Sequence, residues 1–417
     1  MSHIDELIAK NCPDGVSFEP LAKIGKWYGG GTPSKSRSEF WMSGTIPWVS
    51  PKDMGPRIVE TTEDYITEAA VVASTTKLVP ENSVALVVRS SILDRILPSA
   101  LIPIPVALNQ DMKAVVPRED ILPGYIAHVL RSNGPALLRF ARRTGGSVAS
   151  IESRKLFSFR IPVPPLEVQR EIVRILDQFT ELEAELEAEL EARRQQYEHY
   201  RDSLLTFPEA GGVRWVSMGE VGTIFGGLVG KSKHDFSDGN VRFVSYVNIL
   251  KNIAVNVEAA DFVRVEPGER QRTLQRGDIL FTGSSETPHE VGMSSVLTAE
   301  VGEPLYLNSF SIGFRLNDVR LLGPDFAKHL FRSGAMRRQI VRTASGVTRF
   351  NVSKARLAKI EVPIPSLLDQ QRIASVLDDF EALVNDLSVG LPAELAARRK
   401  QYEYYRDRLL SFKELVA

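Results

Sequence analysis

The sequence predicts an α/β (mixed α+β) fold in which two similar globular domains are separated by two long antiparallel coiled-coil helices. The main observation is a long repeat. Residues 161–179 recur from Val362 at an offset of 201 residues, and residues 192–207 recur from Ala397 at an offset of 205, with 12 of these 16 positions identical. This period lies far outside the roughly 20 to 50 residues of solenoid repeats. It therefore predicts two similar halves with pseudo-two-fold symmetry.

Apolar residues in both copies of the repeat recur in steps of three and four, which is the spacing of a coiled-coil helix. The first ladder comprises Ile172, Ile175, Phe179, Leu182, Leu186, Leu190 and, after a skipped step at Arg193, Tyr197, Tyr200 and Leu204. The second comprises Ile373, Val376, Phe380, Leu383, Leu387, Leu391, Leu395, Tyr402, Tyr405 and Leu409, with one more step of four. We expect Gly390 and Pro392 to break this second helix, with Pro392 restarting it in its first turn. A plain structural coiled coil is the alternative, and the globular segments between the helices count against it.

The order of the elements predicts a circular arrangement. Residues 1–10 are expected to form a short helix, and an expected strand over 16–21 matches another over 213–218. The second strand follows the end of a long helix, whereas the matching helix end for the first strand lies at the other terminus, over 409–417. We therefore expect the two terminal segments to lie close together. The predicted parts are residues 1–15, 16–160, 161–212, 213–361 and 362–417.

The two globular segments, 16–160 and 213–361, share an order of short strands, turn-rich loops and one basic helix. Residues 28–30 recur as 225–227, residues 47–53 as 243–248, residues 81–90 as 277–284, and residues 108–111 as 307–310. Helices are expected over 124–143 and 324–342, each followed by a loop, over 144–151 and 343–350. The loop residues differ between the halves, which predicts two sites of one architecture that recognise different ligands.

Composition excludes several classes of protein. The single cysteine, Cys12, rules out a disulfide framework and a cysteine-based zinc site, and the six histidines show no spacing typical of metal ligands. No apolar run approaches the roughly 18 residues of a membrane span, and no signal peptide opens the chain. We therefore expect a cytoplasmic protein with no membrane contact and no metal site.

Charge is unevenly distributed along the chain. Lysine and arginine exceed aspartate and glutamate by five over residues 16–160 and by five over 213–361. The balance is −6 over 161–207 and −2 over 362–417. Basic domains favour a polyanionic partner, and acidic helices are usually solvated or docked on protein.

The sequence contains no recognisable catalytic set. It has no dinucleotide-binding glycine motif and no nucleophile elbow, and the segment from Gly226 to Ser232 is one residue short of a phosphate-binding loop. We therefore expect neither catalytic residues nor a bound cofactor in this chain.

The loops instead contain the residue types that bind nucleic acid, because serine, threonine, asparagine, glutamine and arginine bond base edges and phosphates. An ordinary turn residue is the alternative at each position. The candidates in the first segment are Thr32, Ser34, Lys35, Ser50, Lys52, Arg89, Ser90, Ser91, Asn109, Gln110, Arg143 and Ser147. Those in the second are Lys231, Lys233, Tyr246, Asn248, Thr282, Ser284, Ser285, Asn308, Ser309, Arg342, Thr343, Ser345 and Arg349.

Two motifs carry a family resemblance that covers essentially the whole chain. The pattern Pro-x-Pro-x-Leu-x-x-Gln occurs at 162–169 and again at 363–370, and the helix end Tyr-x-x-Tyr-Arg-Asp-x-Leu-Leu-x-Phe occurs at 197–207 and 402–412. This double occurrence resembles the type I restriction–modification specificity subunit. The resemblance implies two target recognition domains, each of which binds one half of a bipartite double-stranded DNA target.

The same resemblance implies partners. Two methyltransferase subunits would supply S-adenosylmethionine binding and adenine-N6 methylation, and motor/nuclease subunits would use ATP and Mg for restriction. The long helices would set the spacer and dock the methyltransferases, through Tyr197, Tyr200, Leu204, Phe207, Tyr402, Tyr405, Leu409 and Phe412. Packing between the two helices is the alternative role for these side chains. A stand-alone sequence-specific DNA-binding protein is the alternative function, and a coiled-coil scaffold is a third.

Tandem tetrads over residues 182–193 offer a mechanism for the spacer, because similar tetrads in this family adjust the gap between half-sites. Four residues advance a helix by about 6 Å and turn it by about 40° beyond a full rotation. One base pair advances DNA by about 3.4 Å and turns it by roughly 35°. One tetrad is therefore predicted to shift the spacing by one or two base pairs.

Overall fold

The computed structural model describes residues 3–143, 148–208, 212–385 and 390–415, which form two compact units. Unit 1 combines Met1–Leu186 with Leu395–Ala417, and unit 2 is Glu187–Glu394. Each unit thus joins one globular domain to parts of both repeated helical stretches. Among the described residues, no helix is long and apolar enough to cross a membrane, and no group of three or more acidic, histidine or cysteine side chains forms a metal site.

The globular part of unit 1 is a mixed α+β domain, as predicted. Its elements are α1 (His3–Asn11), β1 (Ser17–Pro20), β2 (Gly25–Gly29), β3 (Ile46–Val49), β4 (Tyr65–Ile66), α2 (Glu68–Ala73), β5 (Leu78–Val79), β6 (Ser83–Val87), β7 (Ser99–Ile102), β8 (Val106–Leu108), β9 (Met112–Pro117), α3 (Pro123–Ser132), α4 (Gly134–Ala141), α5 (Ser153–Ser158) and β10 (Arg160–Val163). One sheet has the strand order β2-β9-β6-β7 and another β4-β3-β8-β5. Strand β6 is buried along its whole length, so the core lies on both of its faces.

Unit 2 repeats this architecture. Its elements are β11 (Arg214–Ser217), α7 (Met218–Val221), β12 (Gly222–Gly226), β13 (Val241–Val244), α8 (Tyr246–Lys251), β14 (Phe262–Val263), β15 (Ile279–Thr282), β16 (Ser284–Ser285), β17 (Ser294–Val296), β18 (Leu305–Leu307), β19 (Ser311–Leu316), α9 (Pro324–Leu330), α10 (Gly334–Arg342), β20 (Ala344–Ser345), β21 (Phe350–Val352), α11 (Lys354–Leu357) and β22 (Glu361–Ile364). The sheet β12-β19-β15-β17 corresponds to β2-β9-β6-β7. Parallel pairing of β13 with β18 likewise corresponds to that of β3 with β8.

The repeated stretches form the helices α6 (Leu166–Leu204), α12 (Leu367–Asn385) and α13 (Gly390–Leu409). The predicted restart of the second stretch is present, since α13 begins at Gly390, whose φ is 78°, with Pro392 in its first turn; residues 386–389, where the predicted interruption falls, lie outside the described ranges. Within unit 1, α6 and α13 run antiparallel. The ring of Phe179 lies 5.3 Å from that of Tyr405, and one turn further along α6 the carboxylate of Glu183 lies 2.7 Å from Arg399.

The predicted apolar ladders describe only part of the buried surface of these helices, because each helix start has two apolar faces. In α6, Val168 and Leu176 are fully buried although neither belongs to the ladder, while the ladder residue Leu182 is exposed. In α12, Leu377 is fully buried while the ladder residue Val376 is exposed. The second face packs on the unit's own globular domain, as the contact of α12 with α9 illustrates. Sequence spacing alone revealed only the seam between helices.

The glutamine of each Pro-x-Pro-x-Leu-x-x-Gln motif joins a long helix to its globular domain. Gln169 accepts a hydrogen bond from the main-chain N–H of Leu122 at 2.8 Å and donates to the carbonyls of Asp120 and Pro164. Gln370 makes the equivalent three bonds, including 2.8 Å from the N–H of Gly323. Both side chains are buried, so each amide fixes the direction in which its helix leaves the domain.

The predicted helices over 124–143 and 324–342 are wrong in one respect: each is two helices. In unit 1 the break between α3 and α4 is followed directly by Pro135, whose ring and missing N–H prevent continuation of the preceding helix. In unit 2 the hydroxyl of Ser333 caps the N-terminus of α10 by accepting from the N–H of Met336. The loop predicted over 343–350 also contains strand β20, which pairs with β21.

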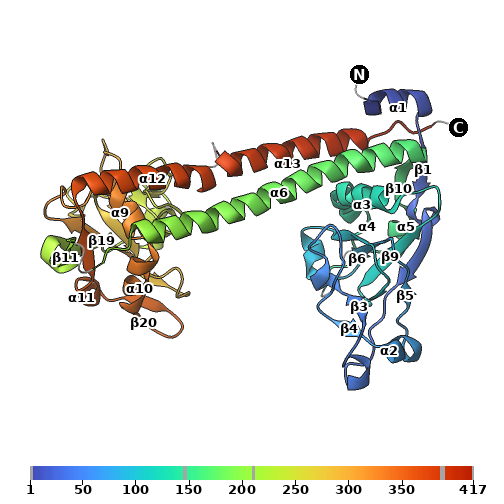
Figure 1. Cartoon of the computed structure of the whole chain (residues 1–417), viewed down its shortest axis with the longest axis horizontal. Helices are drawn as coiled ribbons and strands as arrows, with labels where there is room; N and C mark the ends of the chain where they lie inside the picture. The colour runs from blue at the N-terminus through green and yellow to red at the C-terminus, as the bar shows by residue number, and fades with distance from the viewer. Residues whose placement is uncertain (1–2, 144–147, 209–211, 386–389, 416–417) are drawn as a thin grey trace. The chain divides into compact units, whose positions relative to one another are not determined.

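The two terminal segments lie side by side in unit 1, as the circular arrangement predicts (Figure 1). The N–H of Val16 donates to the carbonyl of Lys413 at 2.9 Å, and the N–H of Leu415 donates back to Val16 at 2.9 Å. An ion pair of 2.7 Å between Arg408 and Asp5 adds a side-chain contact. The segment after α13 therefore completes unit 1 from the far end of the chain.

Candidate nucleic-acid interface

The ends of the equivalent strands β6 and β15 are built alike in the two units. In unit 1 the residue after β6 is Val88, and its N–H donates to the carbonyl of Asp111 at 2.8 Å. In unit 2 the residue after β15 is Gly283, and its N–H donates to the carbonyl of Phe310 at 3.0 Å. Asp111 and Phe310 therefore occupy the same place in the fold.

A second pair of hydrogen bonds holds the segment before α5 in unit 1 and the segment before α11 in unit 2 in equivalent places. The N–H of Ile151 donates to the carbonyl of Val88 at 2.8 Å, and the N–H of Val352 donates to that of Gly283 at 2.9 Å. The residue three positions before this bond is Val148 in unit 1 and Arg349 in unit 2.

An asparagine turn aligns a third segment. The side-chain oxygens of Asn109 and Asn308 each accept a bond from the N–H two residues on, at 2.7 and 3.0 Å. Their own N–H groups donate to the last residues of β3 and β13, at 2.8 and 3.1 Å. Two residues beyond those strand ends lie Pro51 and Tyr246, which are therefore equivalent.

A neighbouring glycine is required by this asparagine turn. A Cβ atom on Gly30 would lie 1.8 Å from the carbonyl oxygen of Asn109, and one on Gly227 would lie 1.9 Å from that of Asn308. This close approach explains why the second glycine of the pair recurs in both halves of the sequence.

The loop that follows β6 in unit 1 has the same length as the loop that follows β15 in unit 2. The last residue of β6 donates its N–H to the carbonyl of Pro98 at 3.1 Å, and the last residue of β15 donates to that of Met293 at 2.9 Å. Counting along the two loops makes Arg95 equivalent to Glu290.

Six positions at this end of the sheet thus share a main-chain frame but carry different chemistry. The equivalent pairs, unit 1 first, are Pro51 and Tyr246, Arg89 and Ser284, Ser90 and Ser285, Arg95 and Glu290, Asp111 and Phe310, and Val148 and Arg349. At one of these positions unit 1 has a positive side chain and unit 2 a negative one. At four others a polar or charged side chain in one unit corresponds to an apolar or neutral one in the other. We define these six positions of each unit as its recognition set.

In unit 2 the recognition set surrounds a cavity of ≈ 320 Å³, lined by Tyr246, Ser284, Ser285, Glu286, Glu290, Phe310 and Arg349. Four of these were predicted from the sequence, and the other three were missed. Glu290 is fixed by bonds from the hydroxyls of Ser285, at 3.1 Å, and Tyr246, at 3.3 Å. Burial raises the pKa of Tyr246, and the negative charge of Glu290 raises it further, so the phenol stays protonated and donates.

Phe310 is a large aromatic residue in a turn, and it is 67% exposed. The guanidinium of Arg349 lies 5.9 Å from the centre of this ring. An apolar side chain in a polar turn is a signal that the sequence carries, since Phe310 stands two residues after Asn308 of the repeated Leu-Asn element.

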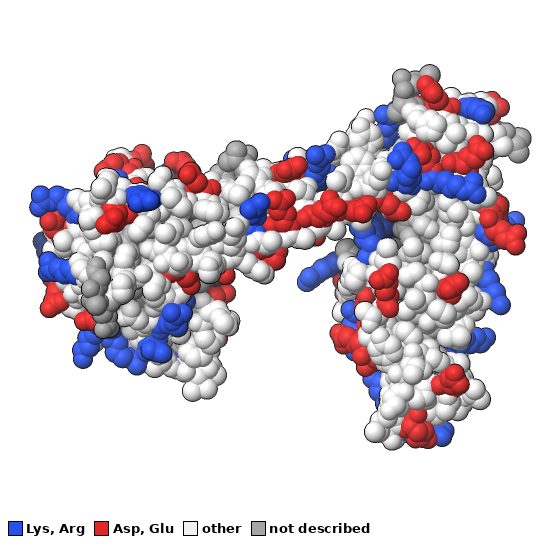
Figure 2. All heavy atoms as spheres, in the orientation of Figure 1, with Lys and Arg blue, Asp and Glu red and all other residues white. Residues whose placement is uncertain are grey.

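Basic side chains flank the recognition set of each unit. In unit 2 lysine and arginine gather around α10 and β20 (Figure 2). The exposed residues there are Arg338, Arg342, Arg349, Lys354 and Arg356. Unit 1 has exposed counterparts in Arg139, Arg142, Arg143, Arg154 and Lys155. Helix α6 is different, since a row of acidic side chains runs along it (Figure 2).

Unit 1 has a cavity of ≈ 510 Å³ beside its recognition set, and Pro51, Lys52, Arg95 and Ile96 are among its lining residues. The ammonium of Lys52 is neutralised by Glu63 at 2.6 Å and Asp64 at 3.0 Å. Arg95 is exposed, so a ligand in this cavity can reach its guanidinium.

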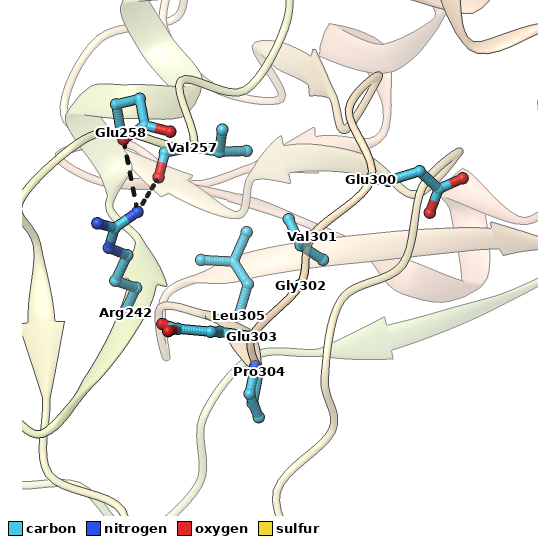
Figure 3. A pocket seen from close by; sticks show the side chains of 9 residues that line it. All are labelled: Arg242, Val257, Glu258, Glu300, Val301, Gly302, Glu303, Pro304 and Leu305. Atoms are coloured by element: carbon cyan, nitrogen blue, oxygen red, sulfur yellow. Dashed lines mark hydrogen bonds and ion pairs between the residues drawn. The ribbon is translucent and has the colours of Figure 1, made fainter.

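Another cavity of unit 2, of ≈ 340 Å³, has the wrong charge for nucleic acid (Figure 3). Its guanidinium, Arg242, donates to the carbonyl of Val257 at 3.0 Å and lies 3.8 Å from Glu258. Glu300 and Glu303 also line it, and Figure 3 shows Glu300 pointing away from Arg242. Three carboxylates against one arginine would repel a phosphate backbone.

The predicted DNA-binding residues divide by exposure. The exposed ones are Ser34, Lys35, Lys52, Arg89, Ser91, Gln110, Arg143, Lys233, Ser309, Arg342, Ser345 and Arg349. The half-buried ones are Thr32, Ser90, Asn109, Lys231, Tyr246 and Ser284, and the buried ones are Ser50, Asn248, Thr282, Ser285, Asn308 and Thr343. Ser147 lies outside the described residues.

Several of these side chains are committed to the fold, which favours the alternative of a structural turn residue. Ser50 donates to Asp53 at 2.8 Å, and Asn248 donates to the carbonyl of Asn256 at 2.8 Å. Lys231 is paired with Glu269 at 2.6 Å, which lowers the pKa of that glutamate to about 2. A side chain that satisfies its own turn has little capacity left for a base edge.

The predicted docking residues also divide by exposure. Tyr197, Tyr402 and Leu409 are buried in their own units, where packing accounts for them. Tyr405, Phe207 and Phe412 are half-buried. Tyr200 is 41% exposed and Leu204 is also exposed, so these two present apolar surface to a partner. Tyr404, which the sequence analysis did not select, is 61% exposed.

Comparison with known proteins identifies relatives of both halves. The family described as "Type I restriction modification DNA specificity domain" matches residues 13–192 and again 212–397. The EcoR124I/EcoR124II type I restriction enzyme specificity subunit of Escherichia coli is 60% identical over 198 residues, which are 46% of this chain and about half (49%) of that relative. A putative type I restriction enzyme specificity subunit of Haemophilus influenzae is 32% identical over 276 residues, which are 64% of this chain and 68% of that relative.

Solved structures show the same fold at low sequence identity. The S subunit of a type I restriction–modification system from M. genitalium has a TM-score of 0.51 at 14% identity, covering 95% of this chain and 96% of its own. A chain from a study of complex assembly and conformational transition of the type I R-M system has a TM-score of 0.61 at 17% identity, covering 96% and 98%.

Proposed function

The chain belongs to the family of type I restriction–modification DNA specificity subunits, and from this membership we propose that it selects the DNA sequence for a type I restriction–modification enzyme. Each unit binds one half of a bipartite double-stranded DNA target. The chain acts by recognition and carries no catalytic step itself.

One observation carries the proposal: the two recognition sets share a main-chain frame and differ in side-chain chemistry. A common frame docks on a common feature of DNA, namely its backbone, while different side chains select different bases. The exposed basic residues beside each set supply the phosphate contacts, whose strength depends on salt. Two half-sites of different sequence are the expected ligand.

Catalysis belongs to the partners in this proposal. Two methyltransferase subunits bring S-adenosylmethionine and methylate adenine N6, and motor/nuclease subunits use ATP and Mg for restriction. This chain brings them to the target, so it is required for both activities. Most side chains of the recognition sets are suited to hydrogen bonding or stacking, which supports a role in binding.

The direct test is to map N6-methyladenine in host DNA with and without this gene. We expect a bipartite sequence, two fixed half-sites with a gap of fixed length, to lose its methylation completely when the gene is removed. Restoring the gene restores the pattern. A methylome that is identical in both strains contradicts the proposed function.

Exposed aromatic surface on the long helices supports a docking role for Tyr200. Its ring lies 5.4 Å from that of Phe380 within unit 2, yet 41% of the residue is open to a partner. Aromatic residues contribute strongly to interfaces, with truncation costing about 1 to 2 kcal/mol or more at a hot spot. We expect Tyr200→Ala to weaken methyltransferase binding by roughly tenfold.

The affinity is measured by titrating purified methyltransferase without DNA, with melting temperature as the check on folding. Val347→Ala is the matched control, because Val347 is 93% exposed but lies in the β20–β21 hairpin. Tyr405→Ala, predicted to act similarly, reports on folding as well because Tyr405 stacks on Phe179. Unchanged affinity for the Tyr200 variant rules out its docking role.

A further inference from the structure

Among the charged residues that line the cavity of unit 2, Arg349 and Glu290 have opposite charges, and Glu286 is a second carboxylate. Arg349 reaches it from the β20–β21 hairpin, and Glu290 from the loop between β16 and β17. Neither is paired with an oppositely charged side chain among the described residues. Both charges are therefore open to a ligand.

The Arg349 guanidinium is oriented for a bidentate contact. Its Nε donates to the hydroxyl of Ser284 at 2.7 Å, and the ring of Phe310 lies beside it. Within the described part of the chain, its two terminal nitrogens make no hydrogen bond. Paired terminal N–H groups match the O6 and N7 acceptors of guanine, which is the commonest specific contact in the major groove.

The Glu290 carboxylate has the complementary preference. Both hydroxyl bonds that fix it, from Ser285 and Tyr246, fall on Oε2. The other oxygen, Oε1, accepts no bond from the described residues. A carboxylate accepts from the exocyclic amino group of cytosine or adenine and is repelled by the carbonyl oxygens that guanine and thymine present in the same groove.

We propose that the cavity of unit 2 reads a guanine through Arg349 and, on the same or an adjacent base pair, an amino-bearing base, cytosine or adenine, through Glu290. This inference rests on the proposed function and assigns base chemistry to one half-site. Ser284, Ser285 and Tyr246 act as positioning residues, because they bond the two reading groups.

Unit 1 cannot read the same bases through these positions. Val148 replaces Arg349 and Arg95 replaces Glu290, so both reading groups are lost or reversed in charge. The half-site of unit 1 therefore serves as an internal reference in every measurement, since substitutions in the unit 2 cavity leave its recognition set unchanged.

The test uses the complete methyltransferase complex and a panel of duplexes in which each position of the methylated target is replaced by the other three base pairs. Initial methylation rates are measured for the wild type, Arg349→Lys, Arg349→Ala and Glu290→Gln. Each Arg349 variant is expected to lose roughly tenfold or more of its discrimination at one guanine of the unit 2 half-site. Glu290→Gln is expected to do so at one cytosine or adenine, and which of the two is lost identifies the base.

Arg320→Ala and Glu258→Gln are the charge-matched controls, because both residues are exposed in unit 2 and line no part of this cavity. A uniform fall in rate across the panel, with every base preference intact, would make Arg349 a phosphate contact and overturn the inference alone. A wild-type complex that methylates no bipartite sequence overturns the proposed function, and the inference with it. Arg349→Lys keeps the charge and guards against a loss due only to misfolding.

Discussion

Replacing residues 213–361 by the equivalent segment of another family member is expected to exchange one half of the methylated sequence and leave the other half unchanged. The segment contains the whole recognition set of unit 2 and none of that of unit 1. Its two ends meet at one strand pair, since β11 lies antiparallel to β22 with Ser217 opposite Glu361. The exchanged domain is therefore attached at a single place.

Folding of this exchange variant depends on contacts between the inserted domain and the retained helices. Asp202 on α6 accepts from the N–H of Gly334 at 2.9 Å, and Gln370 on α12 accepts from the N–H of Gly323. His329 lies between Tyr197 at 3.2 Å and Asp378 at 2.6 Å. A donor segment that keeps the histidine at this position preserves the buried hydrogen-bonding network, whose disruption would cost about 1 to 3 kcal/mol per unsatisfied group.

Methylome sequencing reads out the exchange directly. The reciprocal replacement of residues 16–160 is the matched control and is expected to change the other half instead. A change in both halves after either single exchange would show that the two units do not read DNA independently, and the modular interpretation would then fail.

Deleting the tetrad Leu186–Glu189 is expected to keep both half-sites and shorten the gap between them by one or two base pairs. Helix α6 continues without a break from unit 1 into unit 2, so the deletion removes about 6 Å of the connecting helix and changes its rotation by about 40°. Leu190, Glu191 and Ala192 then take the places of Leu186, Glu187 and Ala188, and Arg193 takes that of Glu189.

The helix itself is expected to survive this deletion, because leucine, glutamate and alanine are good helix formers. The ion pair of Glu189, in the deleted turn, with Arg193 at 3.4 Å is exposed and contributes at most about 1 kcal/mol. Circular dichroism checks the helix content, and methylome sequencing measures the gap. An unchanged gap would show that this part of α6 does not set the distance, whereas altered half-site bases would show that it shapes the recognition domains.

Periodicity and repetition were enough to predict much of the architecture. The repeated apolar spacing predicted the long helices, the start of a helix at Gly390 and the meeting of the two termini, because these features follow from local helix geometry and from the repeat itself. Local signals were weaker where a break depends on a single residue. Pro135 divides α3 from α4, although the apolar spacing on its two sides is that of a single helix.

Two similar halves, a basic domain in each half, and loops rich in the residue types that bond nucleic acid could all be predicted from the sequence. It could not rank those side chains, because a serine or asparagine that caps its own turn reads the same as one that faces a ligand. The folded structure distinguished Asn308, whose side chain bonds the main chain of Val244, from Arg349, whose terminal nitrogens are available to a ligand. It also brought Glu290 and Phe310 into one cavity with Tyr246. These residues lie far apart in the sequence, and their proximity is set by strand pairing across the sheet, which no local pattern encodes.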